Sequence, residues 1–198
     1  GDELINAAIT DGTMHIVLSS ANGKAIRFHE SDVRAQGRVT AGVRGMTLED
    51  GDVVVSMETL SEDNTLLASI TENGYGKRTA LAEYPLQKRA GKGVITIKTD
   101  ERNGKVVSVL PVGDDDELML LTTTGKLIRI SAGSISVISR NTKGVTLMAM
   151  EGDETVVGVA TLAERDEDET GVAVQETLPG AELADDDAEP EKADDADV

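Results

Sequence analysis

The feature that most constrains the fold of this chain is an internal repeat of about 50 residues. Each copy has an apolar stretch, a tight turn with a glycine, and a second stretch that carries basic residues. The turn glycines are Gly23, Gly74 and Gly125, so successive turns lie 51 residues apart. Glycine between two apolar runs is typical of a β-hairpin, because it adopts the positive φ of a tight turn without steric cost. A chain with this period is predicted to stack equivalent units.

Each repeat is predicted to contain four strands, which is typical of a propeller blade. The hairpin supplies two strands, a basic loop leads into the third, and a closing strand is the fourth. The loop glycines Gly45, Gly93 and Gly144 are spaced by 48 and then 51 residues, so we expect three extra residues in the first loop. The predicted strands are 14–18, 22–28, 44–48 and 54–60 in the first repeat, 65–70, 73–79, 92–97 and 106–112 in the second, and 117–121, 124–130, 143–147 and 156–162 in the third.

The chain is predicted to be all-β, with a repeat domain over residues 1–162 and a tail over 163–198. The repeats cover about residues 14–60, 65–112 and 117–162. Residues 1–10 resemble 152–161, so we expect them to form the last strand of a preceding blade. About three complete blades and one strand cannot close a typical ring, so the chain is expected to be a fragment or a shortened relative of a larger propeller. The alternative is a plain β-sandwich without repeats.

The formal net charge of −18 is distributed unevenly. Residues 163–198 contain 15 acidic and two basic residues, whereas residues 1–162 contain 22 acidic and 17 basic residues. The tail has few large apolar side chains, so it cannot bury enough surface to offset its ordering entropy and is predicted to be disordered. Two hypotheses remain open for it: it weakens nucleic-acid binding by competing with phosphates, or it only keeps the domain in solution.

Candidate catalytic and metal-binding residues are scarce. The chain has no cysteine and two histidines, His15 and His29, neither of which has a nucleophile at a recognisable spacing. The acidic run 114–117 lacks the alternating ligands and the glycine of a calcium-binding EF-hand loop, so a solvated turn is expected. The sequence predicts no catalytic site, no metal site and no cofactor in this chain. It contains no apolar run of the roughly 20 residues that span a bilayer and no basic leader, so a cytoplasmic location is expected.

Basic residues recur at similar positions of every repeat and would form a stripe on one edge or outer face. Such a stripe can hold the phosphates of a duplex without reading its bases. The glycines beside Lys92 would let the backbone approach phosphates. Aromatic residues make up 2% of the chain, which disfavours single-strand binding by base stacking. The alternative is that these side chains only aid solubility. The candidate DNA-binding residues are Lys24, Arg27, Arg34, Arg38, Arg44, Lys77, Arg78, Lys88, Arg89, Lys92, Lys126, Arg129, Arg140 and Lys143.

Three stretches resemble the C-terminal domain of bacterial DNA gyrase A subunits: residues 26–46, 73–94 and 139–145. The resemblance implies a β-pinwheel, a six-bladed relative of the propeller in which neighbouring blades exchange strands. It also implies that duplex DNA wraps around a basic perimeter. Residues 87–93 read QKRAGKG, similar to the family's signature box, but they stand in a later blade and are interpreted as a repeat-equivalent of that box.

The resemblance further implies a non-catalytic part of an ATP-dependent type II topoisomerase that introduces negative supercoils. ATP and Mg would then act elsewhere in the enzyme. The implied partners are double-stranded DNA, the rest of the gyrase A subunit and the gyrase B subunit in an A2B2 assembly, without a membrane, at the bacterial nucleoid. The alternatives are the C-terminal domain of a topoisomerase IV A subunit and a protein-interaction propeller.

Overall fold

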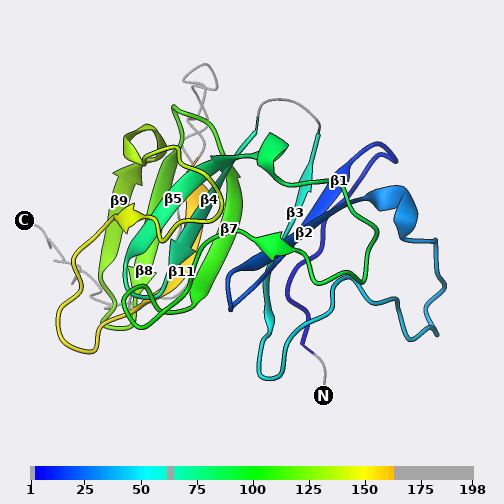
Figure 1. Cartoon of the computed structure of the whole chain (residues 1–198), viewed down its shortest axis with the longest axis horizontal. Coiled ribbons are helices and arrows are strands. Elements are labelled where there is room, and N and C mark those ends of the chain that lie inside the picture. The colour runs from blue at the N-terminus through cyan, green and yellow to red at the C-terminus, as the bar shows by residue number, and fades with distance from the viewer. Residues whose placement is uncertain (1–2, 62–64, 163–198) are drawn as a thin grey trace, which may run out of the picture. The chain divides into compact units, whose positions relative to one another are not determined.

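The computed structural model describes residues 3–61 and 65–162 and is shown in Figure 1. These residues form eleven β-strands and three one-turn 3-10 helices, so the predicted all-β class is confirmed. The predicted acidic tail lies outside the described residues.

The strands form three antiparallel sheets, one for each repeat. The first contains β1 (His15–Ser20), β2 (Lys24–His29), β3 (Val54–Leu60) and β6 (Val94–Ile95) in the order β3-β1-β2-β6. The second contains β4 (Leu66–Thr71), β5 (Tyr75–Ala80), β7 (Val106–Val112) and β10 (Val145–Thr146) in the order β10-β5-β4-β7. The third contains β8 (Glu117–Thr122), β9 (Leu127–Ser131) and β11 (Val156–Leu162) in the order β11-β8-β9.

Neighbouring sheets exchange a strand at their outer edge. β6 comes from the second repeat but pairs with β2, where Val94 lies opposite Ala25. β10 comes from the third repeat but pairs with β5, where Val145 lies opposite Gly76. Each exchanged strand thus completes the preceding sheet and not its own, which is the β-pinwheel arrangement that the resemblance implied.

The repeat keeps a spacing of 51 residues through the loops as well as the hairpins. Gly42, Gly93 and Gly144 all have a positive φ, of 72°, 71° and 77°. The buried residues Met46, Ile97 and Met148 follow them at the same spacing. The prediction of three extra residues in the first loop is therefore wrong. Gly42, and not Gly45, is the equivalent of Gly93.

Two predicted strands do not form. Residues 44–48 contain no strand, and residues 3–10, the described part of the segment predicted as the last strand of a preceding blade, form no strand and have exposed side chains. Neither segment forms ladder pairing with a sheet among the described residues, although the Asn6 side chain donates a hydrogen bond to the Met57 carbonyl oxygen in β3 at 2.8 Å. The third repeat contains the four predicted strands, but its sheet has three described strands because β10 pairs with the second sheet.

The apolar cores lie between adjacent sheets. One cluster joins residues of the first two repeats, including Val17, Leu67 and Ile97. A second joins the second and third repeats, including Ile70, Leu118 and Met148. Ile97 and Met148 lie just beyond the ends of the exchanged strands β6 and β10. Strand exchange and core packing therefore stabilise the same contact between consecutive repeats, which is called a joint below. The 3-10 helices Glu30–Asp32, Leu81–Glu83 and Ala132–Ser134 each follow an outer hairpin strand.

The tight approach at the exchanged strand predicts a specific sensitivity at Gly93. A Cβ there would lie 2.4 Å from the Ala25 carbonyl oxygen, whereas a Cβ at Gly51, which also has a positive φ, would meet no atom within 4 Å. Gly51→Ala is expected to lose about 1 kcal/mol of unfolding free energy from the left-handed conformation alone. Gly93→Ala is expected to lose at least about 2 kcal/mol, because the clash adds to that strain. Urea unfolding measures both, and equal losses would contradict the proposed joint geometry.

Candidate nucleic-acid interface

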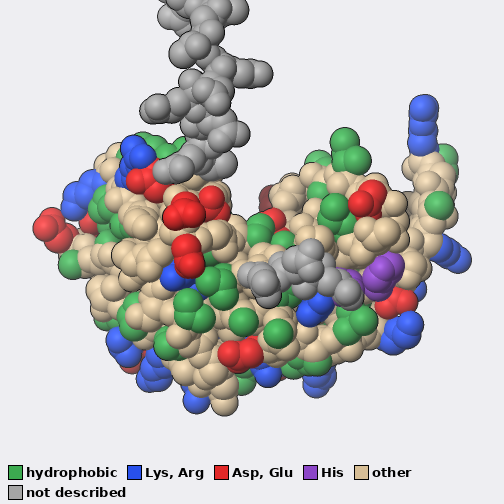
Figure 2. Space-filling model, turned by 90° about the horizontal axis from the view of Figure 1, so that it is seen from above, with side chains coloured by type: hydrophobic (Ala, Val, Ile, Leu, Met, Phe, Trp, Pro, Cys, Tyr) green, Lys and Arg blue, Asp and Glu red, His purple; other side chains and the backbone are tan. Residues whose placement is uncertain are grey.

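The candidate interface is the outer rim, defined here as residues 33–45, 85–98 and 136–147 with the outer hairpin strands β2, β5 and β9. β6 and β10 belong to the rim and form the outer edges of their sheets. Figure 2 shows several Lys and Arg side chains along the lower margin of the view. The fourteen predicted DNA-binding residues lie in or beside this rim, but the structure divides them into joint residues and surface residues.

Arg27 and Arg78 are equivalent joint residues that hold one repeat to the next. Arg27 donates hydrogen bonds to the carbonyl oxygens of Leu81 and Tyr84 at 3.3 and 3.4 Å and contacts Nδ1 of His15. Arg78 is 4% exposed and donates to the carbonyl oxygens of Ile135 and Gly133 at 2.9 and 3.2 Å.

An ion pair with Asp114 completes the surroundings of Arg78. The guanidinium groups of Arg27 and Arg78 are thus engaged by carbonyl oxygens of the following repeat. They are not presented to a phosphate.

Lys77 is also a joint residue. Its side chain is buried, and its Nζ donates to the carbonyl oxygens of Ser139, at 2.6 Å, and Arg140, and to Oγ1 of Thr142 at 3.0 Å. Burial lowers the pKa of Lys77 to about 8. This lysine ties β5 to the loop of the third repeat and is inaccessible to DNA.

Arg89 and Arg140 occupy equivalent positions on the rim and are half-buried. Arg89 donates to the carbonyl oxygens of Asp32 and Arg44, both at 3.0 Å. Arg140 donates to the carbonyl oxygen of Ile95 at 2.9 Å and lies over the Tyr84 ring. Both arginines fasten their loop to the neighbouring backbone. The Nε of Arg140 is buried without a hydrogen-bond partner among the described residues.

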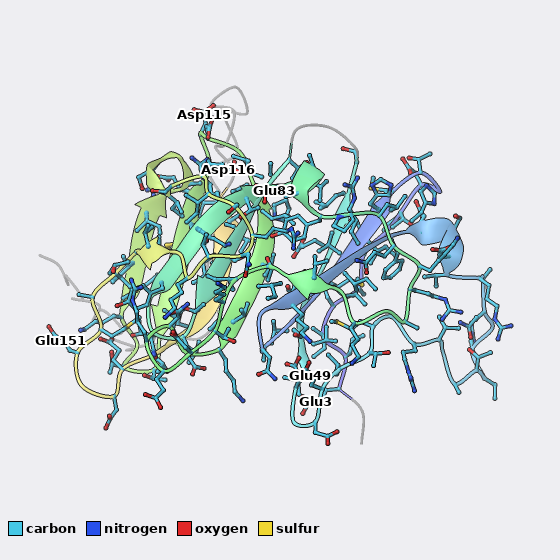
Figure 3. All side chains as sticks on the ribbon, in the orientation of Figure 1. Glu3, Glu49, Glu83, Asp115, Asp116 and Glu151 are labelled. Carbon is cyan, nitrogen blue, oxygen red and sulfur yellow. The ribbon has the colours of Figure 1, made fainter. Side chains whose placement is uncertain are left out.

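A third group of bases is paired with carboxylates, and all of its members except the half-buried Lys24 are exposed. The pairs are Lys24–Glu49, Lys88–Asp32, Lys126–Glu151, Lys126–Glu154, Arg129–Glu117 and Lys143–Asp100. Figure 3 shows Glu49 and Glu151 toward one end of the strands and Asp115 and Asp116 toward the other. Exposed pairs of this kind contribute about 0–1 kcal/mol, so a phosphate can replace the carboxylate.

Glu154 differs from the other carboxylates because its side chain is nearly inaccessible. It accepts hydrogen bonds from the hydroxyls of Thr122, at 2.7 Å, and Thr124, and it pairs with Lys126 at 3.0 Å. The two hydroxyls, followed by Lys126, lower the pKa of Glu154 to about 2. Glu154 therefore fixes the turn around Gly125 and keeps Lys126 at the surface.

The remaining predicted bases are exposed and make no ion pair within residues 3–61 and 65–162: Arg34, Arg38, Arg44 and Lys92. Of the glycines beside Lys92, Gly93 has a packing role, because a Cβ there would lie 2.4 Å from the Ala25 carbonyl oxygen where the exchanged strand meets β2. Three further exposed bases, Lys98, Arg102 and Lys105, were not predicted because they do not recur from repeat to repeat.

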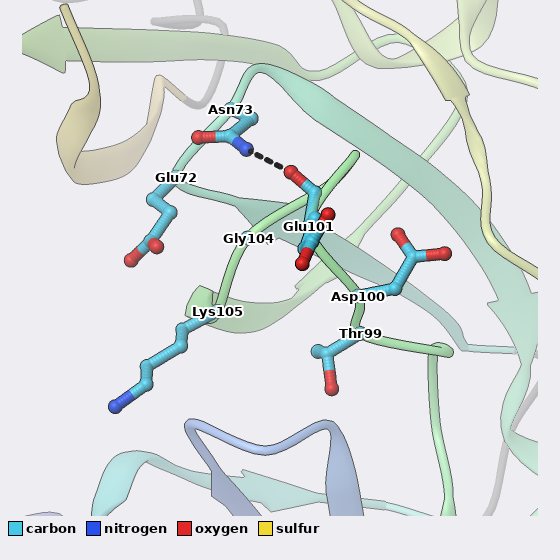
Figure 4. Close-up of a pocket in the computed structure, with 7 residues that line it drawn as sticks. All are labelled: Glu72, Asn73, Thr99, Asp100, Glu101, Gly104 and Lys105. Carbon is cyan, nitrogen blue, oxygen red and sulfur yellow. Dashed lines mark hydrogen bonds between the residues drawn. The ribbon is translucent and has the colours of Figure 1, made fainter. Parts of the chain in front are cut away.

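The hollow shown in Figure 4 has a volume of about 340 Å³. It is lined by three carboxylates, those of Glu72, Asp100 and Glu101, and by a single base, Lys105. This excess of negative charge disfavours a phosphate ligand. Across the described residues, no group of three or more His, Cys, Asp or Glu side chains could hold a metal ion, and no helix is long and apolar enough to cross a membrane.

Comparisons of the sequence with a family model and with known proteins indicate the same family. The family model described as "DNA gyrase C-terminal domain, beta-propeller" matches residues 15–61, 66–113 and 116–163, one match for each repeat. The chain is 51% identical over 164 residues to the DNA gyrase A subunit of Escherichia coli K12, an alignment that covers 83% of this chain and 19% of the relative. It is 43% identical to the DNA gyrase A subunit of Pseudomonas aeruginosa over 83% of this chain and 18% of the relative. The chain thus spans about a fifth of the length of these relatives.

Two solved structures of related domains have a similar fold. A DNA gyrase A C-terminal domain aligns with a TM-score of 0.71 and 31% identity over 76% of this chain and 51% of that one. The C-terminal domain of a DNA topoisomerase IV aligns with a TM-score of 0.73 and 28% identity over 77% of this chain and 48% of that one.

The division of the basic residues predicts different costs for two equivalent arginines. Arg78→Gln removes a buried cation and leaves two carbonyl oxygens without their donor, so it is expected to lose about 3 kcal/mol of unfolding free energy. Arg129→Gln removes an exposed ion pair and is expected to lose less than about 0.5 kcal/mol. Urea unfolding midpoints compare the two variants. A stable Arg78→Gln variant would show that this arginine does not hold the joint.

Proposed function

Because this chain belongs to the DNA gyrase C-terminal domain family, we propose that it is a DNA-wrapping module that binds duplex DNA through its outer rim without sequence preference. The observation that carries the proposal is the set of exposed bases that follows the rim from repeat to repeat. These bases are Arg34, Arg38, Arg44, Lys88, Lys92, Lys126, Arg129 and Lys143. They recur on a series of equivalent sheets, so a bound duplex would meet similar charges at each repeat and bend along them.

The negative charge around these bases determines the expected affinity and salt dependence of DNA binding. Four of these bases are paired with carboxylates, and residues 1–162 contain more acidic than basic residues. A duplex must displace carboxylates and loses affinity as salt screens its phosphates. Binding is therefore expected to be weak and steeply dependent on salt.

The role in a complete enzyme follows from the family. We infer a non-catalytic contribution to negative supercoiling by an ATP-dependent type II topoisomerase, in which the rest of the A subunit and the B subunit supply the chemistry with ATP and Mg. In this scheme the module presents a curved duplex segment to the other subunits. It would act in the cytoplasm, together with chromosomal DNA.

Two exposed lysines allow a matched test of the proposed rim. Lys92 lies on the rim beside β6, whereas Lys105 directly precedes the inner strand β7 and lines the acidic hollow. Lys92→Ala is expected to weaken binding of a labelled duplex and to reduce the slope of log affinity against log salt by about 1. Lys105→Ala is expected to change neither.

Fluorescence anisotropy across a salt series measures both variants. Equal effects would show that the rim is not the DNA path. A folded wild-type chain that binds no duplex at low salt would favour a protein-interaction propeller instead.

A further inference from the structure

Two exposed apolar side chains lie among the basic residues of the rim. Leu86 is 57% exposed and Val137 is 52% exposed. They are 51 residues apart, so they occupy equivalent positions in the second and third repeats. Single exposed apolar side chains are common on protein surfaces and need no explanation. Two that recur at the period of the repeat, on the rim that carries the exposed bases, indicate a shared use.

The joints hold the backbone of both residues in place. Leu86 forms a parallel bridge with Arg27 of β2, and Val137 forms the equivalent bridge with Arg78 of β5. The N–H of the residue after each one donates a hydrogen bond to the carbonyl oxygen of that arginine, at 2.8 and 2.9 Å. A backbone that is already fixed loses little conformational entropy when a ligand covers its side chain.

The exposure of these side chains does not come from an open joint. The exchanged strands β6 and β10 already cover the outer edges of β2 and β5, the strands beside which the two residues lie. The second repeat, which contains Leu86, has a described repeat on each side. Leu86 and Val137 thus remain exposed although the joints next to them are formed.

The bases next to these residues indicate which ligand would cover them. Lys88 follows Leu86 by two residues, and its side chain is 90% exposed. Lys92 lies further along the same loop, and Lys143 lies on the loop that contains Val137. Two residues of extended chain span about 7 Å, so an apolar side chain and a cation face one ligand at short range. The backbone of a DNA duplex alternates apolar deoxyribose edges with charged phosphates and matches this pattern.

Insertion of the apolar side chains between base pairs does not fit a wrapped duplex. An apolar wedge in the minor groove unstacks a base step and kinks the duplex toward its major groove. The duplex would then bend away from the protein, whereas wrapping bends it toward the rim. Packing against the sugars requires no unstacking and no particular sequence.

We propose that Leu86 and Val137 pack against the deoxyribose groups of a bound duplex and supply a part of its affinity that salt does not screen. The proposal rests on the proposed function, in which the bases of the rim meet the phosphates. Loss of a phosphate contact reduces the slope of log affinity against log salt. Loss of an apolar contact lowers the affinity by the same factor throughout the salt series and leaves the slope unchanged, because apolar burial releases no counterion.

A pair of matched valine variants tests the proposal. Val137→Thr replaces one methyl group with a hydroxyl of similar size and is expected to weaken binding of a labelled duplex about threefold at every salt concentration. Val157→Thr is the control, because Val157 is also 52% exposed but lies on β11, the inner strand of the third sheet. The control is expected to bind as the wild-type chain does. Fluorescence anisotropy across a salt series measures the affinity and the slope of each variant.

A second substitution tests whether the two positions act alike. Leu86→Asn is similar in size to the wild-type residue and is expected to weaken binding at least about threefold, again with an unchanged slope. The two residues lie on separate loops, so the double variant is expected to lose about tenfold. Circular dichroism confirms that each variant is folded.

The outcomes separate this proposal from the proposed function. If the wild-type chain binds duplex and both Val137→Thr and Leu86→Asn bind as Val157→Thr does, the apolar contact is overturned while DNA binding by the rim stands. A loss confined to A·T-rich duplexes would assign the contact to thymine methyl groups and would overturn packing against the sugars. A folded wild-type chain that binds no duplex overturns the proposed function, and the apolar contact with it.

Discussion

The joint between consecutive repeats is the interaction on which the rest of this structure depends. At each joint an exchanged strand pairs with the preceding sheet over only two residues, so the strand pairing alone is weak. Three further kinds of contact reinforce it. The carbonyl oxygen of the turn glycine, Gly23 or Gly74, accepts two backbone hydrogen bonds. A following apolar side chain, Ile97 or Met148, is buried, and an arginine binds carbonyl oxygens of the next repeat. A stack built in this way is stabilised by nearest-neighbour contacts, as in other repeat proteins.

The joints also determine which basic side chains are accessible to a ligand, because those that bind carbonyl oxygens in a joint are not. Some basic residues donate to carbonyl oxygens between sheets, and others are exposed at the surface. Both classes recur at the same spacing from repeat to repeat, so the spacing does not distinguish them. Arg78 and Lys143 illustrate the two outcomes, because the first is buried in a joint while the second is exposed and paired with Asp100. Recurrence alone therefore overestimates the number of basic side chains that are available to a ligand at the surface.

Much of the fold could be predicted from local signals in the sequence. The closing strands Val54–Leu60, Val106–Val112 and Val156–Leu162 were predicted with the observed bounds, because each is an apolar run that begins after a turn. Strand exchange was predicted only from the family resemblance, because a two-residue strand is too short to show a periodic pattern in the sequence. The first loop was aligned on Gly45 because Arg-Gly there resembles Lys-Gly in the later repeats, whereas backbone conformation identifies Gly42. Burial of Lys77 could not be predicted, because its partners are carbonyl oxygens 62 and 63 residues away. The fourteen candidate contacts with DNA remain a prediction as a set.

The most direct test of the central claim, that the recurring basic residues divide into joint and surface classes, is an NMR titration of the arginine Nε–H groups with a short duplex. Arg34 and Arg38 are exposed, whereas the Nε–H of Arg78 is bound to the Ile135 carbonyl oxygen. The account predicts that the signals of Arg34 and Arg38 shift as duplex is added and that the signal of Arg78 does not. A shift at Arg78 comparable to those of the exposed arginines would contradict the division and would place the DNA at the joints.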